Sequence, residues 1–290
     1  MIKKGIILAG GKGTRMSPLT KAVNKQLLPI YDKPLIYYPL SILMLSGIRN
    51  ILIIVNKGQL EQYKKILPNG DNLGIKISYA EQLSPKGLPD AFLIGEKFIN
   101  NDNVALILGD NFFYGQNLTN KLRKQAQLSK GASVFLHPVN KSELYGVAKI
   151  NKKNKIIGIK EKPKKIYSNY AVTGLYYFDK KVIEYTKKLK PSKRKELEIV
   201  DLLNIYRKKN KLSADFIGRG GAWLDTGTLD DFYKTSAFVE TIENRQGFKI
   251  ACLEEIALRN NWIKKKDILN SIKFYGKCNY SKYLSNLIKK

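Results

Sequence analysis

The sequence predicts an α/β fold built on a mostly parallel central sheet. In the first half of the 290-residue chain, short apolar runs alternate with helical stretches. Three of the apolar runs, at residues 6–9, 51–55 and 104–108, are uninterrupted and contain β-branched residues, which is typical of strands covered on both faces. Alternating strands and helices require crossover connections, which are right-handed and place successive strands parallel to each other.

The elements of the N-terminal half follow in order from this pattern. Each short apolar run is taken as a strand, and each longer run that mixes apolar and polar residues is taken as a helix. We expect strands at residues 3–10, 50–56, 75–82 and 103–110, and helices at residues 34–47, 59–67, 89–99 and 117–129.

The pattern changes after Gly131, where strand-like segments follow one another, and helices dominate from Leu229 onward. This layout indicates one α/β domain at residues 1–228 that carries an extension, followed by a helical C-terminal subdomain at residues 229–290. We expect strands at residues 132–139, 145–150, 155–163 and 169–179, helices at 182–190 and 198–209, strands at 212–218 and before the turn in 222–228, and helices at 232–247, 252–263 and in the tail.

The net charge of the chain, +28, raises the question of a nucleic-acid partner. The positive residues are 44 lysines and only 8 arginines, spread over the whole length. Arginine is the residue that reads phosphate and guanine by bidentate contacts, so its scarcity favours a lysine-rich solvated surface over nucleic-acid binding. Weak binding to polyanions at low salt is still expected as a side effect.

Composition also excludes other classes of protein. His137 is the single histidine, which rules out a multi-histidine zinc site and leaves little room for a Ser-His-Asp triad. No apolar run reaches the length of a membrane span, and the apolar stretch near the N-terminus is too short for a secretory signal. The two cysteines, Cys252 and Cys278, show no metal-binding spacing. We therefore expect a cytoplasmic protein without a membrane partner.

The stretch GIILAGGKGTRMSP places a glycine-rich loop directly after the first predicted strand. It is not a P-loop, because Ile6 stands where the first glycine belongs and Gly13 replaces the hydroxyl residue that would bind magnesium. It is not a dinucleotide fingerprint, because Met16 breaks the pattern G-x-G-x-x-G. Glycines after a buried strand still let backbone amides wrap a phosphate, and Arg15 and Lys25 add positive charge nearby.

Two aspartates are candidate metal ligands. Asp110 ends the apolar strand at residues 103–110, so its side chain would lie at the carboxyl edge of the sheet, where ligands of open α/β folds bind. Asp225, in WLDTGT, lies in a turn of small residues. Mg²⁺ prefers hard oxygen ligands, often one or two carboxylates with phosphates and waters. Taken alone, each aspartate is equally consistent with capping a turn.

Several stretches of the sequence, including the glycine-rich loop and the segments around the two aspartates, resemble those of the sugar nucleotidyltransferases. The resemblance starts with GIILAGGKGTRMSPLT and NKQLLPIYDKPLIYYPL and extends in order over almost the whole chain. Within the family, the chain is most similar to the branch that joins dTTP and glucose 1-phosphate into dTDP-glucose and pyrophosphate. The other matching blocks are SPKGLPDAFLIGE, LILGDNFFYG, LYGVAKI, EKP, NYAVTGLYYFD, LKPSKRKELEIVDL, AWLDTGT, ENRQG and EEIALR.

The resemblance implies a Rossmann-like, three-layer nucleotidyltransferase fold, with a nucleotide half at residues 1–130 and a sugar-binding extension as the sugar-phosphate half at 131–228. It implies a magnesium-dependent first step of dTDP-deoxysugar synthesis, such as that of dTDP-rhamnose for lipopolysaccharide O-antigen. It also implies a homotetramer inhibited by a dTDP-sugar end product at a subunit interface, with contacts from residues 229–290. Arg259 lies in the block that matches this regulatory region.

The resemblance further assigns roles to single residues. The catalytic set would be Arg15, Lys25, Asp110, Lys162 and Asp225, in which Asp110 and Asp225 hold Mg²⁺, while Arg15 and Lys25 stabilise charge as pyrophosphate departs. The nucleotide would contact Leu8, Gly10, Gly11, Gly13, Thr14, Arg15, Gln26, Gln82, Gly87 and Asp110. Gln82 and the backbone near Leu8 and Gly87 would read the base. The sugar phosphate would contact Tyr145, Gly146, Glu161, Lys162 and Val172.

Two of the sugar-phosphate residues are neighbours in the chain: Lys162 would hold the phosphate, and Glu161 the sugar hydroxyls. Adjacent residues in a strand point to opposite faces, so both can reach one ligand only at a bulge or at the end of a strand. Pro163 favours a strand end.

Some positions depart from the family pattern. Lys12 adds a charge to the glycine loop, Pro89-Asp90 replaces a small residue and a glutamine, and residues 54–58 replace a segment that more often ends in Thr-Pro. The segment at residues 114–120 departs at a basic position of the regulatory region. Base preference and feedback inhibition therefore follow less directly from the resemblance than catalysis does.

Two rival hypotheses stay open. The first is a related uridylyl-, cytidylyl- or adenylyltransferase, because base choice depends on few contacts. The second is a protein of another class, either a binding or regulatory protein that keeps the fold without turnover or a polyanion binder. The joint presence of Arg15, Lys25, Asp110, Lys162 and Asp225 favours an active enzyme.

Overall fold

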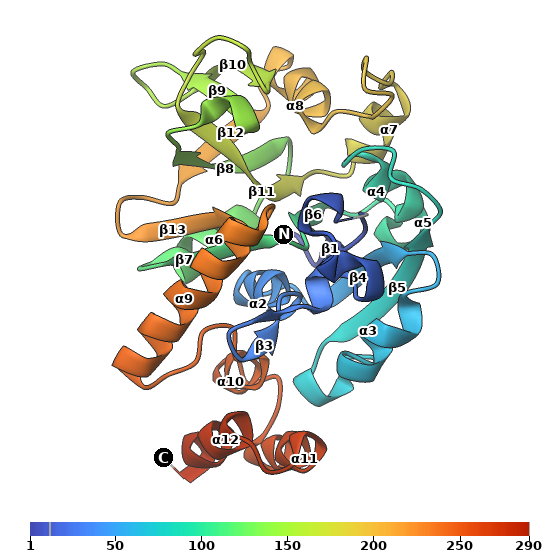
Figure 1. Cartoon of the computed structure of the whole chain (residues 1–290). Helices are drawn as coiled ribbons and strands as arrows, with labels where there is room; N and C mark the ends of the chain where they lie inside the picture. Colours follow the sequence, from blue (N-terminus) through green and yellow to red (C-terminus); the bar gives the residue numbers. More distant parts are fainter. Residues whose placement is uncertain (12, 290) are drawn as a thin grey trace.

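A computed structural model describes residues 1–11 and 13–289 (Figure 1). Lys12, which made the glycine loop look like a P-loop, lies outside the described residues. The strands are β1 (Lys4–Leu8), β2 (Pro29–Ile30), β3 (Lys33–Pro34), β4 (Asn50–Asn56), β5 (Lys76–Gln82), β6 (Val104–Leu108), β7 (Asn111–Gly115), β8 (Ala132–Pro138), β9 (Gly146–Ile150), β10 (Ile156–Glu161), β11 (Tyr170–Phe178), β12 (Leu212–Phe216) and β13 (Gly221–Asp225).

The helices cover both faces of the central sheet and continue beyond it at the C-terminus. They are α1 (Leu19–Ala22), α2 (Tyr37–Leu45), α3 (Leu60–Ile66), α4 (Asp90–Ile94), α5 (Glu96–Ile99), α6 (Leu118–Ala126), α7 (Val182–Lys187), α8 (Ile199–Lys208), α9 (Leu229–Gln246), α10 (Leu253–Arg259), α11 (Lys265–Tyr275) and α12 (Asn279–Lys289). None of these helices is both long and apolar enough to cross a membrane.

The central sheet has nine strands. Seven of them follow the order β10-β9-β11-β6-β1-β4-β5, β8 pairs with β11, and β12 pairs with β8. The pairs β6–β1, β1–β4 and β4–β5 are parallel, as expected, while β11 runs antiparallel to its neighbours β6, β8 and β9. The predicted α/β class with a mostly parallel centre is confirmed.

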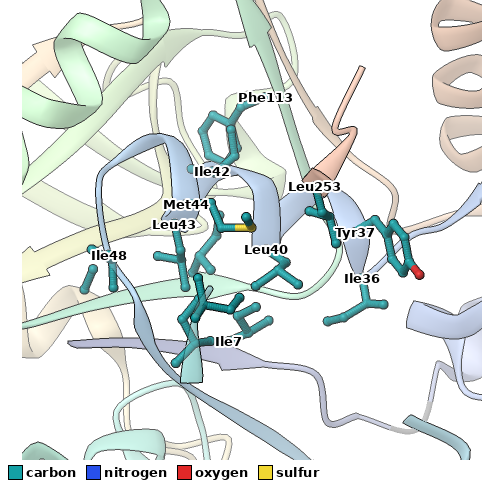
Figure 2. Packing of buried hydrophobic residues seen from close by; sticks show 14 of the residues in the cluster. Ile7, Ile36, Tyr37, Leu40, Ile42, Leu43, Met44, Ile48, Phe113 and Leu253 are labelled. Atoms are coloured by element: carbon teal, nitrogen blue, oxygen red, sulfur yellow. The ribbon is translucent and has the colours of Figure 1, made fainter. Parts of the chain in front are cut away.

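Alternate residues of β1 show the three layers of the fold. Ile6 packs on one face with buried residues of α4, α7 and α8, and Ile7 packs on the other with residues of α2 and α6. Figure 2 shows Ile7 beside Leu40 and Leu43 of α2. This alternation follows from the two-residue period of a strand, and it explains why an uninterrupted apolar run was needed at this position.

The short elements α1, β2 and β3 were not predicted, and two further features differ from the sequence-based expectation. The helix predicted at residues 89–99 is divided at Gly95 into α4 and α5. A Cβ at Gly95 would lie 3.0 Å from Ile6 Cδ1 and 3.2 Å from Leu52 Cδ2, so glycine is needed for the close approach to the sheet at the cost of helix propensity. The second feature is β7, which was not predicted and pairs antiparallel with β13.

The two ends of the molecule carry different elements. Figure 1 shows β9, β10 and α8 at one end and α10 to α12 at the other. The boundary predicted at residue 228 coincides with Thr228, the N-cap of α9, whose hydroxyl accepts a hydrogen bond from the backbone N–H of Asp231 at 3.2 Å. The division into functional domains remains a prediction.

Candidate active site

The candidate site lies at the carboxyl edge of the parallel strands. β4 and β6 flank β1 on opposite sides. The chain runs from β1 to β4 and β5 on one side and then returns to β6 on the other, and the crevice at such a switch point is where ligands of open α/β sheets bind. Backbone hydrogen bonds continue past the strand ends. Ala9 N–H donates to Ile54 C=O at 2.8 Å, and Gly109 N–H donates to Leu8 C=O at 2.9 Å. The glycine loop and the turn before Asp110 are therefore held against each other.

Two cavities meet at this edge, of about 350 Å³ and about 240 Å³, and they share Gly10, Arg15 and Asp110. Every residue that the sequence singled out for binding or catalysis lines one of them. The larger cavity is also lined by Leu8, Gln82, Gly87, Tyr145, Gly146, Glu161, Lys162, Val172 and Asp225. The smaller cavity is also lined by Gly11, Gly13, Thr14, Lys25 and Gln26. The structure thus brings the predicted residues together, while their individual roles remain predictions.

The glycine loop needs its glycines for close approach. Gly10 lies so near the Gln82 amide that a Cβ there would be 1.7 Å from Gln82 Nε2. Gly13 has a left-handed φ of 58°, and its carbonyl accepts a hydrogen bond from the Thr20 hydroxyl at 2.8 Å. The loop can therefore present backbone amides to an anion without Cβ atoms in the way.

Arg15 follows the loop, in a short 3₁₀ turn at residues 14–16. Its guanidinium lies against Gly227, where a Cβ would be 3.0 Å from Nη2. Gly227 belongs to the turn that follows Asp225, so this turn makes room for a cation beside that carboxylate. Arg15 thus provides a positive charge that lines both cavities, as Asp110 provides a negative one.

The Asp110 carboxylate, about a quarter exposed, forms an ion pair with the buried Lys25. Lys25 Nζ lies 2.7 Å from Asp110 Oδ2, and Asn111 Nδ2 donates to Asp110 Oδ1 at 3.1 Å. Burial by itself would raise the pKa of Asp110, but the charge of Lys25 and the hydrogen bonds from Lys25 and Asn111 outweigh it and hold this pKa below its ordinary value. Asp110 is thus kept ionised.

The pairing of β13 with β7 carries Asp225 to the same place. Asp225 pairs with Asn111 in the strand register, and Thr226 donates from its N–H at 3.2 Å and its hydroxyl at 2.8 Å to the backbone carbonyl of Asp110. Burial, and next the negative charge of Asp110, raise the pKa of Asp225 to about 6, although Lys25 and Arg15 act in the opposite direction. The ionised form of Asp225 is therefore disfavoured by burial and by the charge of Asp110.

These two carboxylates fit a hard divalent cation. They supply oxygen donors, and the repulsion that raises the pKa of Asp225 is what a bound cation would relieve. Within residues 1–11 and 13–289, no group of three or more histidine, cysteine, aspartate or glutamate side chains comes together. This is consistent with a magnesium site that takes its remaining ligands from substrate phosphates and water.

The structure shows how the chain neighbours Glu161 and Lys162 can both face the larger cavity. β10 ends at Glu161, and Lys162 has a left-handed φ of 40°, with its N–H donating to Tyr145 C=O at 3.0 Å. The expected strand end is therefore present, and both side chains line the cavity. Burial raises the pKa of Glu161, against the opposing charges of Lys162 and Arg194.

Sequence reasoning missed Asn111 and Trp223 as members of the site. Asn111 Oδ1 accepts hydrogen bonds from Trp223 Nε1 at 2.6 Å and from Gly174 N–H at 3.1 Å, while its amide nitrogen donates to Asp110. The Trp223 ring packs edge-on against Tyr145, with ring centroids 5.1 Å apart. Both residues lie in matching blocks within two positions of a predicted metal ligand, so this spacing was an available signal.

Arg194 was missed as well. Its Nη2 lies 2.7 Å from Glu198 Oε2 and 3.3 Å from Glu161 Oε1, and it lines the larger cavity. The loop that contains Arg194 also contacts the loop around Lys86 and Gly87, because Leu197 N–H donates to Lys86 C=O at 2.8 Å. No periodicity or motif links these two loops in the sequence, so only the fold shows that they meet.

Comparisons with known proteins agree with this geometry. The profile of the Nucleotidyl transferase family matches residues 4–242. The glucose-1-phosphate thymidylyltransferase of Neisseria meningitidis serogroup A is 50% identical over 287 residues, which cover 99% of this chain and 100% of the relative.

Two solved structures are also similar. One, assigned as a glucose-1-phosphate thymidylyltransferase from Bacillus anthracis in complex with a sucrose, superposes with a TM-score of 0.75 at 40% identity over 81% of this chain and 94% of the other. The other, a UDP-glucose pyrophosphorylase complexed with UDP-glucose, gives a TM-score of 0.73 at 29% identity over 83% and 100% of the two chains.

Proposed function

This chain belongs to the nucleotidyl transferase family, and a glucose-1-phosphate thymidylyltransferase is 50% identical to it over 287 residues. We propose that it transfers a thymidylyl group from dTTP to α-D-glucose 1-phosphate. The products are dTDP-glucose and pyrophosphate. One observation carries the assignment of the site: a glycine-loop cavity and a carboxylate- and lysine-lined cavity meet at Arg15 and Asp110. A reaction that joins two phosphorylated substrates needs two such compartments with cationic groups at their junction.

The reaction forms a bond between a phosphate oxygen of the sugar phosphate and the α-phosphorus of dTTP. It breaks the bond from that phosphorus to the oxygen bridging to the β-phosphate, and that electron pair leaves with pyrophosphate. The backbone amides of the glycine loop and the Arg15 guanidinium would bind the triphosphate and the charge that develops on pyrophosphate. Lys162 would bind the sugar phosphate, and Glu161 the sugar hydroxyls.

We propose that the divalent cation is Mg²⁺ and that Asp110 and Asp225 hold it. Magnesium would supply neutralisation of phosphate charge at the junction of the two cavities. Lys25 keeps Asp110 ionised through the 2.7 Å pair, which supports its role as a ligand. The proposed nucleotide donor is dTTP. UTP is the rival donor, because the similar solved structure is that of a UDP-glucose pyrophosphorylase.

We extend the proposal to a cytoplasmic homotetramer that a dTDP-deoxysugar end product inhibits, with the product serving a pathway such as dTDP-rhamnose and O-antigen synthesis. The support is the match of residues 254–259 to the regulatory block and the position of Arg259, largely exposed at the end of α10 and paired with Glu255 at 2.7 Å. Sedimentation would give the subunit count, and titration with a dTDP-deoxysugar would show whether turnover falls.

A substrate matrix tests the catalytic proposal. Purified protein is mixed with Mg²⁺, with each of dTTP, UTP, dCTP and ATP, and with each of several hexose 1-phosphates, and pyrophosphate release is measured. The fastest release is expected with dTTP and glucose 1-phosphate. Absence of release with every triphosphate would contradict the proposed function, and faster release with UTP would move the assignment to a uridylyltransferase.

A further inference from the structure

Asn56, the last residue of β4, holds the glycine loop through its side-chain amide. Asn56 Oδ1 accepts a hydrogen bond from Gly11 N–H at 3.0 Å, and Asn56 Nδ2 donates to Gly11 C=O at 2.9 Å. A peptide has its donor and acceptor at fixed positions, so this two-point contact determines which end of the Asn56 amide is the oxygen.

The same oxygen accepts a second hydrogen bond, from Gln82 Nε2 at 3.0 Å. Because Asn56 Oδ1 is an acceptor, the group of Gln82 that faces it has to be the NH₂ group. The carbonyl oxygen of Gln82 is then the acceptor that this side chain offers to the larger cavity, which it lines. Gln82 is 6% exposed and lies against Gly10, so its side chain is confined. The two ends of an amide are similar in size, so the hydrogen bond to Asn56 decides which of them faces the cavity.

The far end of the network is also anchored by the backbone. Asn56 Nδ2 donates to Gln59 Oε1 at 3.2 Å, and Asn24 donates to the same oxygen. Asn24 Oδ1 accepts from Gln26 N–H at 3.0 Å and from the Tyr63 hydroxyl at 2.7 Å. The hydrogen bonds of this network are therefore consistent in direction, and the backbone at residues 11 and 26 favours one orientation of the Asn56 and Asn24 amides.

We propose that Asn56 is a positioning residue that sets base specificity by holding Gln82 with its carbonyl oxygen toward the nucleobase. An acceptor at this position favours a pyrimidine whose N3 carries a hydrogen, as in thymine and uracil, and disfavours cytosine, whose N3 is itself an acceptor. The proposal rests on the proposed nucleotidyl transfer and deepens its base selection. It concerns this chain in particular, because residues 54–58 are one of the places where the sequence departs from the family pattern.

The test compares kcat/KM for dTTP, UTP and dCTP in the wild-type protein and in Asn56→Leu and Asn56→Ala. The wild-type protein is expected to prefer dTTP over dCTP by at least about 100-fold, since a site built around one hydrogen bond rejects a base that lacks its partner. Both variants free the Gln82 amide to turn, and the preference is expected to fall by about tenfold. The UTP-to-dTTP ratio should stay unchanged, because both bases present N3–H.

Two further variants separate positioning from general damage. Asn56→Asp keeps an acceptor for Gln82 and should retain the dTTP-over-dCTP preference even where total activity falls. Gln59→Leu removes the other partner of the Asn56 amide without touching Gly11 or Gln82, and it should also retain the preference. A structural defect would lower activity with all three triphosphates and leave their ratios unmoved.

The possible results are distinct. An unchanged dTTP-over-dCTP preference in Asn56→Leu and Asn56→Ala would overturn the inference, as would wild-type protein that uses dCTP as well as dTTP or UTP. If a variant binds but does not turn over, the ratio of dissociation constants for dTTP and dCTP gives the same decision. Wild-type protein that releases no pyrophosphate with any triphosphate would instead contradict the proposed function.

Discussion

Two charge clusters of this molecule are built around buried lysines only eight positions apart, yet they have different surroundings. The cleft cluster consists of Arg15, Lys25, Asp110 and Asp225 and lies where the two cavities meet. The hairpin cluster consists of Asp32, Lys33, Glu243 and Lys249 and lies between the β2–β3 hairpin and the end of α9.

The hairpin cluster is internally matched. Lys33 is 2% exposed, forms ion pairs with Asp32 and, at 2.8 Å, with Glu243, and lies over the rings of Tyr38 and Tyr280. Glu243 also accepts a hydrogen bond from a backbone N–H at 2.8 Å. Two lysines face two carboxylates, so no further charge is required.

The cleft cluster also holds two cations and two carboxylates, but its charges are not all paired directly. Among the described residues Lys25 pairs closely with Asp110, while the neighbouring Asp225 forms no such ion pair and has its pKa raised to about 6 by burial and by the charge of Asp110. The cluster also opens onto cavities large enough for a ligand. The difference teaches that a cluster whose charges are all paired directly serves the packing of the fold, whereas a carboxylate left without a close ion pair beside a cavity is a candidate for ligand or cation binding.

The largest effect is expected for Asp225→Asn. Loss of a proposed metal ligand should lower kcat by about 1000-fold, while the melting temperature stays unchanged or rises, because the folded protein loses a carboxylate whose charged form is disfavoured. Pyrophosphate release and a thermal melt measure the two effects. Asp230→Asn, at an exposed position of α9, is the matched control and should leave both near the wild-type values. Retained turnover in Asp225→Asn would refute the metal assignment.

Lys33→Met should show the opposite behaviour. Removing Lys33 leaves the buried Glu243 and its neighbour Asp32 with Lys249 as the one remaining cation of the hairpin cluster, and the free energy of unfolding should fall by about 3–5 kcal/mol. Turnover per folded molecule, measured well below the melting temperature, should stay within about twofold of the wild-type value, since Lys33 lines neither cavity. A large loss of kcat without loss of stability would break the comparison.

Lys25→Met is the counterpart in the cleft cluster. It should lower kcat/KM by about 100-fold, because a positioned cation at the developing charge is removed and Asp110 loses its partner. Its loss of stability should be smaller than that of Lys33→Met, because Asp110 opens onto the cavities. Urea unfolding of both variants under the same conditions compares them, and an equal loss of stability would contradict the distinction.

The smallest effect is expected for Trp223→Phe. The change removes the 2.6 Å hydrogen bond to Asn111 and keeps most of the ring packing against Tyr145, so kcat/KM should fall by about tenfold and stability by about 1 kcal/mol. Trp262→Phe, outside the two cavities, is the matched control. Equal activities of the two variants would show that Asn111 needs no support from Trp223.

Much of the fold could be predicted because its signals are local. The uninterrupted apolar runs of β1, β4 and β6 are required by burial on both faces, and they were recognisable without a partner strand. The division at Gly95 and the strand β7 were not recognisable, because the first depends on contacts with β1 and β4 and the second on pairing with a segment about 110 residues away.

The candidate site divides in the same way. The sequence by itself determined which residue types could bind phosphate and a hard cation, since glycines after a strand and aspartates at strand ends are local patterns. Only the tertiary structure decided that Lys25 faces Asp110 while Lys33 faces Glu243, and that Asn56 orients Gln82. Hydrogen bonds and ion pairs act over about 3 Å, and only folding brings residues 26 to 210 positions apart within that distance.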